Sequence, residues 1–214
     1  MNVEVATIEF HHAHHFANAE QQYTASKQGT WLFLATEILM FGVFFVSYSL
    51  FRALYPELYQ EASKLLNTTL GATNTVVLLT SSLSMAMAVH YAQKGMREKS
   101  FWALLVTFLL AATFMVIKYF EYTHKFHLGI YPGRYFTYPT DMPSLALFFS
   151  VYYLMTGLHG LHVLVGMGLI AWLMIKTKRR TFSPEYYTPV ECIGLYWHIV
   201  DIIWIFLFPL LYLM

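Results

Sequence analysis

Several ionisable side chains of this 214-residue chain lie inside long apolar runs, where water is scarce. They are Glu37, Lys118, Glu121, His159, His162, Glu191, His198 and Asp201. A charged side chain near the centre of a bilayer costs about 2.5–3.5 kcal/mol on insertion scales, so each should face protein or trapped water and have a partner. Carboxyl and imidazole groups placed in this way can carry protons, ligate metals or join helices by hydrogen bonds.

The last apolar run carries its polar residues at helical spacing. Glu191, Gly194, His198 and Asp201 follow at i, i+3, i+7 and i+10, which is one stripe of an α-helix. Within this stripe His198 and Asp201 are close enough to pair, with the carboxylate fixing the imidazole tautomer or holding the ring protonated. We expect the stripe to face another helix.

The preceding run contains two histidines among glycines. Gly157 and Gly160 predict a close approach of another backbone, and His159 and His162, three residues apart, share a face from which hydrogen bonds can cross between helices. A metal site is the alternative. The paired Glu-x-x-His motif of carboxylate di-metal sites does not occur, and nothing argues for the room that a haem needs. We therefore favour structural hydrogen bonding and predict no metal ligand and no catalytic residue.

Glu37 is surrounded by apolar residues, about ten residues or ~15 Å of helix rise beyond Lys27. At that depth it either exchanges protons or bonds a neighbouring helix as a neutral carboxyl group, and the sequence leaves both readings open.

The histidine-rich segment 11–15 resembles a metal-binding tract, but it precedes the membrane and is typical of a solvated tail.

The surroundings of these residues are those of a membrane protein, since 57% of the chain is hydrophobic and 12% is charged. Runs long enough to cross a bilayer are predicted at Trp31–Leu54, Leu70–Tyr91, Phe101–Phe120, Leu145–Ile175 and Cys192–Tyr212. Backbone amides cannot stay unpaired in lipid, so these runs should be helices. We expect an all-α bundle of five transmembrane helices (residues 27–214) behind a polar tail (residues 1–26), with no cleaved signal peptide.

Charge sets the expected orientation and excludes other classes. The tight basic clusters lie on the second and fourth connections, on the side of the N-terminus, whereas the other side carries Arg52, Lys64, Lys125 and Arg134. The positive-inside bias then predicts a cytoplasmic N-terminus and an outside C-terminus.

A net charge of +1 gives no reason to expect nucleic-acid binding. One cysteine, Cys192, excludes an internal disulfide and multi-cysteine metal sites.

Five motifs in order resemble subunit III of haem-copper respiratory oxidases (cytochrome c or quinol oxidases), in a short five-helix form without the first two helices of the seven-helix version. They are Thr36-Glu37, the segment 74–79 (NTVVLL), Glu121-Tyr122, the segment 157–162 (GLHGLH) and the block from Glu191 through Trp197-His198 and Asp201 to Phe208.

The resemblance implies an accessory subunit with no redox centre of its own, in the inner (plasma) membrane of a prokaryotic cell. Haem and copper belong to partner chains. The subunit would pack on catalytic subunit I and other oxidase subunits, bind phospholipid, and sustain proton uptake and turnover while the complex reduces oxygen and pumps protons. By this resemblance, seven residues make contacts between helices or with lipid or subunits: Glu37, Glu121, His159, His162, Glu191, His198 and Asp201.

Two other functions remain possible at this point. An accessory protein of a nitric oxide reductase system shares the helical pattern. A transporter using Glu37 and Asp201 as proton sites is disfavoured, because the chain shows neither a repeated half nor a pair of interrupted spans. The electron donor, cytochrome c or quinol, binds in a neighbouring subunit, so this sequence does not identify it.

Overall fold

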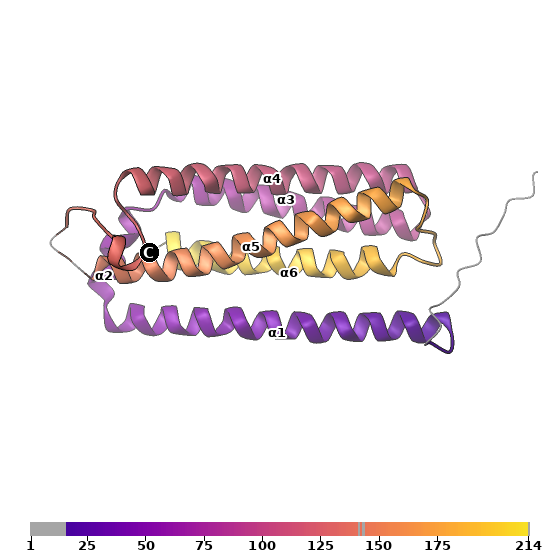
Figure 1. Ribbon diagram of the computed structural model, residues 1–214, viewed down its shortest axis with the longest axis horizontal. Helices are drawn as coiled ribbons and strands as arrows, with labels where there is room; N and C mark the ends of the chain where they lie inside the picture. Colours follow the sequence, from indigo (N-terminus) through magenta and orange to yellow (C-terminus); the bar gives the residue numbers. More distant parts are fainter. Residues whose placement is uncertain (1–15, 141, 143, 214) are drawn as a thin grey trace, which may run out of the picture.

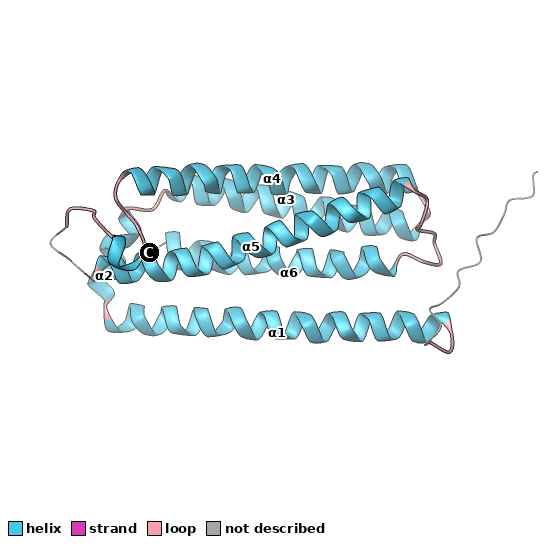
Figure 2. Ribbon diagram, in the orientation of Figure 1, coloured by secondary structure: helices cyan, strands magenta, loops and turns pink. Residues whose placement is uncertain are grey.

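The protein is all-helical in the computed structural model, which describes residues 16–140, 142 and 144–213. Within this part of the chain there is no β-strand (Figure 2). The helices are α1 (Ala19–Leu54), α2 (Pro56–Lys64), α3 (Thr68–Gln93), α4 (Arg97–His127), the short 3-10 helix η1 (Gly133–Tyr135), α5 (Leu145–Lys178) and α6 (Thr188–Tyr212). All of these except α2 and η1 are long and apolar enough to cross a membrane. The prediction of a helical protein with five spans is therefore confirmed.

The first helix begins earlier than its apolar content predicts. It starts at Ala19, twelve residues before Trp31, and the Asn18 side chain caps it by accepting from the backbone nitrogen of Gln21 at 2.8 Å. Residues 19–26 of the expected polar tail are thus helical. At about 1.5 Å per residue, a helix of 36 residues is longer than the ~30 Å hydrocarbon core, so apolar content marks only its embedded part. The histidine tract 11–15 lies outside the described residues.

Helix α2 was not predicted, because nine mixed residues are too few for a span. Pro56 occupies its first turn, where proline is favoured, and Leu58, Tyr59 and Ala62 form its buried face. The helix lies across one end of the bundle, against α5 and α1 (Figure 1). Tyr59 packs edge-on against Tyr48 of α1 and Phe148 of α5, with ring centroids 5.1 Å apart in both pairs.

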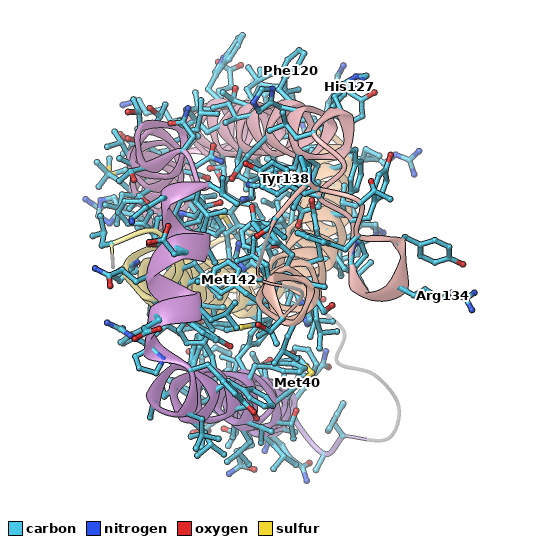
Figure 3. All side chains as sticks on the ribbon, turned by 90° about the vertical axis from the view of Figure 1, so that its left-hand side faces the viewer. Met40, Phe120, His127, Arg134, Tyr138 and Met142 are labelled. Carbon is cyan, nitrogen blue, oxygen red and sulfur yellow. The ribbon has the colours of Figure 1, made fainter. Side chains whose placement is uncertain are left out.

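Four of the long helices form the core, and α1 stands outside it. Helix α3 packs on α4 and α6, and α5 also packs on α4 and α6, which closes a ring; α1 packs mainly on α6. Figure 1 shows α1 set apart from the other helices, and in Figure 3, along the bundle, Met40 lies between α1 and the rest while Phe120 points outward from α4. In the most apolar stretch of α1 11% of the residues are buried, against 44% in α6.

Close packing occurs at Gly166 of α5. A Cβ atom on this residue would lie 2.6 Å from Cζ3 of Trp197, so the Trp197 indole of α6 needs a glycine there. By contrast, Gly157 and Gly160 have nothing within 4 Å of such an atom. The expectation that Gly157 and Gly160 allow a close approach within this chain is wrong, because α6 contacts α5 two turns further along.

Alanine substitutions on α5 separate these two environments. Alanine favours a helix over glycine by about 1 kcal/mol, so Gly157→Ala should leave the free energy of unfolding unchanged or slightly raised. Gly166→Ala should lower it, because overpacking costs about 1–3 kcal/mol and exceeds that gain. Tryptophan fluorescence during denaturant titration in detergent measures both variants. Equal stability of the two proteins would contradict the packing at Gly166.

Candidate functional site

Three buried charged residues form a cluster on α4. Lys118, Glu121 and Lys125 follow at i, i+3 and i+7, and are 6%, 3% and 2% exposed. Nζ of Lys118 lies 2.8 Å from Oε2 of Glu121, and Nζ of Lys125 lies 2.5 Å from Oε1. Two ammonium groups therefore share one carboxylate away from water, which is stable only when further hydrogen bonds complete the group.

Two tyrosines from other helices complete this cluster. The hydroxyl groups of Tyr152 (α5) and Tyr212 (α6) donate to Oε1 of Glu121 at 2.9 Å and 2.6 Å. Nζ of Lys118 lies 2.9 Å from the Tyr212 hydroxyl and 4.8 Å from the centre of the Trp204 ring, so a cation–π contact also shields its charge. Glu121 thus joins α4, α5 and α6 at the C-terminal end of the bundle.

Sequence reasoning found only part of this cluster. Glu121 and Lys118 were expected to have partners, but Lys125 was expected on the outer side as a surface charge, and it is buried. The i, i+4 spacing from Glu121 to Lys125 was the available signal. No signal marked Tyr152 or Tyr212, because their pairing depends on how α5 and α6 pack on α4.

A second polar pair joins α1 to α5. Oε2 of Glu37 lies 2.9 Å from Nε2 of His162, within ion-pair distance but without the angles of a good hydrogen bond. The other ring nitrogen, Nδ1, lies 2.8 Å from the carbonyl oxygen of Leu158. A carbonyl only accepts, so Nδ1 donates to it and Nε2 faces the Glu37 carboxyl group. This geometry can hold or pass one proton.

Glu191 closes a third contact at the opposite end of the bundle from Glu121. It lies in the first turn of α6, where it accepts from Lys27 at 2.9 Å and from the Tyr23 hydroxyl at 3.1 Å, both on α1. The stripe predicted to face a single helix therefore divides. Gly194 lies against Val89 of α3, whereas Glu191 turns to α1.

His198 and Asp201 do not form the expected pair. Nδ1 of His198 lies 2.7 Å from the Ser82 hydroxyl of α3. Asp201 is 2% exposed, and neither of its carboxyl oxygens has a hydrogen-bond partner of normal geometry among the described residues. The prediction failed because the packing of α3 on α6 places Ser82 beside the imidazole. The spacing of residues within α6 cannot predict a partner on another helix.

The two histidines of α5 also point in different directions. His162 turns toward Glu37 on α1, whereas the His159 ring lies against Phe114 of α4 and Trp204 of α6, at centroid distances of 5.7 Å and 5.3 Å. Neither ring nitrogen of His159 has a partner among the described residues. In the same part of the chain no group of three or more His, Cys, Asp or Glu side chains could hold a metal ion.

Comparisons with known proteins give one consistent result. The family model described as cytochrome c oxidase subunit III matches residues 5–214. A probable cytochrome c oxidase subunit 3 of Nocardia farcinica is 35% identical over 86% of this chain and 85% of its own length. A quinol oxidase subunit 3 of Bacillus subtilis is 28% identical over 95% of this chain and 97% of its own length. A cytochrome bo(3) ubiquinol oxidase subunit 3 of Pseudomonas aeruginosa is 30% identical over 87% and 83%.

Removing the carboxylate of the α4 cluster should destabilise the protein. Glu121→Gln leaves the ammonium groups of Lys118 and Lys125 buried beside each other, and breaking a buried pair in this way costs about 3–5 kcal/mol. The free energy of unfolding in detergent measures the loss. The matched control is Glu61→Gln, which removes a pair with Lys64 that is more than half exposed on the lysine side and should change stability by less than about 1 kcal/mol.

A rescue variant tests whether unpaired buried charge causes this loss of stability. Replacing all three charges together, by Lys118→Met, Glu121→Leu and Lys125→Met, leaves no unpaired buried charge and should recover most of the stability lost in Glu121→Gln. If the triple variant is as unstable as Glu121→Gln, unpaired charge does not explain the loss.

Proposed function

The chain belongs to the cytochrome c oxidase subunit III family, and we propose from this that it is the accessory, non-catalytic subunit III of a proton-pumping haem-copper terminal oxidase. The family match over residues 5–214 carries the proposal. The relatives include subunits of both cytochrome c and quinol oxidases, so the proposal concerns the step that these complexes share, the reduction of oxygen to water. The electron-donor site belongs to a partner subunit.

We assign the haem and copper to partner subunits as well. The membrane-embedded histidines of this chain support this assignment, because each has its own local environment. His162 is engaged by Glu37 and the Leu158 carbonyl, His198 by Ser82, and His159 is enclosed by aromatic rings. Redox centres of this kind need several ligands that converge on one point.

The outer surface supports a role within a larger complex. Leu32, Leu39 and Val46 recur every seven residues on α1 and are about 70% exposed, as apolar side chains are when lipid or another helix covers them. On α5, Gly157 and Gly160 are open outward, so a helix of another chain can approach closely there. We propose that catalytic subunit I and membrane phospholipid cover these faces.

The polar contacts support a role in proton handling and in durability during turnover. The Glu37–His162 pair lies on the weakly packed side of the bundle, between α1 and α5, with Oε2 and Nε2 2.9 Å apart. The Glu121 and Glu191 contacts fix α1, α4, α5 and α6 at opposite ends. We propose that Glu37 and His162 support proton uptake, and that Glu121, His159, Glu191, His198 and Asp201 keep the helices in register.

We further propose that the chain lies in the inner (plasma) membrane with its N-terminus in the cytoplasm. The start of α1, the α3–α4 turn and the α5–α6 connection share one end of the bundle (Figure 1). That end carries Lys94, Arg97, Lys99, Lys176, Lys178, Arg179 and Arg180. At the other end Arg52, Lys64 and Arg134 remain, since Lys125 is buried. The positive-inside rule then directs the basic end to the cytoplasm.

The accessory role predicts that removal of this chain shortens the active life of the oxidase but leaves its redox centres unchanged. An oxidase purified without this chain should keep its haem spectrum and initial rate of oxygen reduction, but should lose activity faster during continuous turnover. Glu37→Gln in the assembled complex should lower the rate of proton uptake by about 100-fold, the lower end of the roughly 10²–10⁴-fold effect of a general acid or base. Glu57→Gln, an exposed carboxyl, is the control. A haem spectrum from the isolated chain would overturn the proposal.

The orientation predicts which end a membrane-impermeant thiol reagent reaches. After Cys192→Ser removes the native cysteine, Lys64→Cys should be labelled from outside intact cells and Lys99→Cys only after permeabilisation. Both positions are exposed, so accessibility within the protein does not separate them. Labelling in the reverse order would show a cytoplasmic C-terminus.

A further inference from the structure

An apolar groove runs between α4 and α5 on the face of the ring away from α1. Its cavity volume is about 350 Å³, and its lining is almost wholly carbon. The residues are Phe101, Leu105, Phe108, Leu109, Ala171, Met174, Ile175 and Lys178. The groove therefore lies at membrane depth and ends at Lys178, the last residue of α5.

A basic pocket opens where this groove reaches the end of the bundle. It has a cavity volume of about 950 Å³ and is formed by the α3–α4 turn, the start of α4, the end of α5 and the following connection. Its charged residues are Lys94, Arg97, Lys178, Arg180 and Glu98, four cations and one anion. Phe101 and Lys178 line both hollows, so the pocket and the groove lie next to each other.

The charge in this pocket is not neutralised within the described part of the chain. None of the four cations takes part in a salt bridge there, although Glu98 lines the same pocket. Helix α4 begins at the pocket without a side-chain cap, so its first backbone N–H groups add a partial positive charge. The four cations and the start of α4 therefore make this a site that attracts an anion.

The backbone at this place is also unusual. Arg180 has a φ of +57°, a left-handed conformation that a non-glycine residue adopts only when its surroundings impose it. Pro184 lies 3.0 Å from the position that a Cβ atom of Gly95 would take, so the two turns that form the pocket pack against each other. These contacts hold the cations of two connections around one space.

We propose that the pocket and groove together form a binding site for an anionic phospholipid. The phosphate headgroup lies among Arg97, Lys178 and Arg180, and an acyl chain lies in the groove beside Phe108 and Met174. Basic pockets between transmembrane helices bind anionic headgroups in this way, and Trp102 at the rim fits the headgroup level. No residue of α1 lines this site. Lipid binding there requires a membrane but no redox centre, so the proposal can fail without affecting the proposed oxidase role.

A phospholipid fits better than a free anion or a partner helix. A free phosphate would use the pocket and leave the adjoining apolar groove without a role. A helix of another subunit would cover the groove, but it would need acidic residues at one level to meet a net lining charge of +3, from four cations and one anion. A phospholipid carries one charged and one apolar part in the required order.

Lipid retention by charge-matched variants of the complex tests this site. The complex is reconstituted in nanodiscs of equal phosphatidylcholine and phosphatidylglycerol, and lipids kept after detergent exchange are measured by native mass spectrometry. Arg97→Gln with Lys178→Gln should weaken retention of phosphatidylglycerol roughly 25-fold, about fivefold for each cation removed near a membrane surface. Lys99→Gln with Arg179→Gln removes the same charge at the same end, outside the pocket lining, and should retain the lipid as the unaltered complex does.

Two further experiments distinguish a phospholipid from a partner helix and from free phosphate. With p-benzoylphenylalanine at position 109 in the groove, photocrosslinking should join the chain to phospholipid; a crosslink to another polypeptide overturns the proposal. Inorganic phosphate added to phosphatidylcholine nanodiscs should not raise the melting temperature as phosphatidylglycerol does; equal stabilisation overturns the role of the groove. Equal lipid loss from both double variants would show a general charge effect and would also overturn the site.

Discussion

The exclusion of water from the membrane interior is the constraint on which this structure depends. A buried charge must find its partners in the protein, and Glu121 meets this requirement with two lysines and two tyrosine hydroxyl groups from three helices. Few arrangements of α4, α5 and α6 satisfy all of these groups at once. Apolar packing alone discriminates weakly between arrangements in lipid, so the cluster fixes how the ring closes at this end.

Polar contacts also decide how α1 is held. Little of this helix is buried, yet it contacts the ring at three levels: Lys27 with Glu191, Glu37 with His162, and the Tyr48 hydroxyl with the carbonyl oxygen of Leu210 at 2.6 Å. These contacts set the rotation and height of α1 while leaving its outer face to other molecules. A helix held in this manner suits a subunit that works by joining a larger assembly.

The two ends of the bundle have different chemical characters. The C-terminal end has a buried cluster of charges around Glu121, and α2 packs there on α1 and α5. The other end carries, on its turns, cations without a salt bridge to any described residue, next to an apolar groove between α4 and α5. Internal charges hold helices together at one end, whereas cations line a surface pocket at the other end.

The sequence by itself determined that the chain is a membrane protein, where its long helices lie and which family it resembles. Apolar length fixes the five spans because lipid permits only hydrogen-bonded backbone, and the motif order around Glu37, His159 and Asp201 identified the family. Apolar content could not reveal the polar start of α1 or the short α2. Partners along one helix, such as Lys118 with Glu121, follow from spacing. Partners between helices, such as Ser82 with His198 or Tyr212 with Glu121, were decided only by the tertiary structure, because they depend on helix rotation and register, which spacing within one helix does not specify.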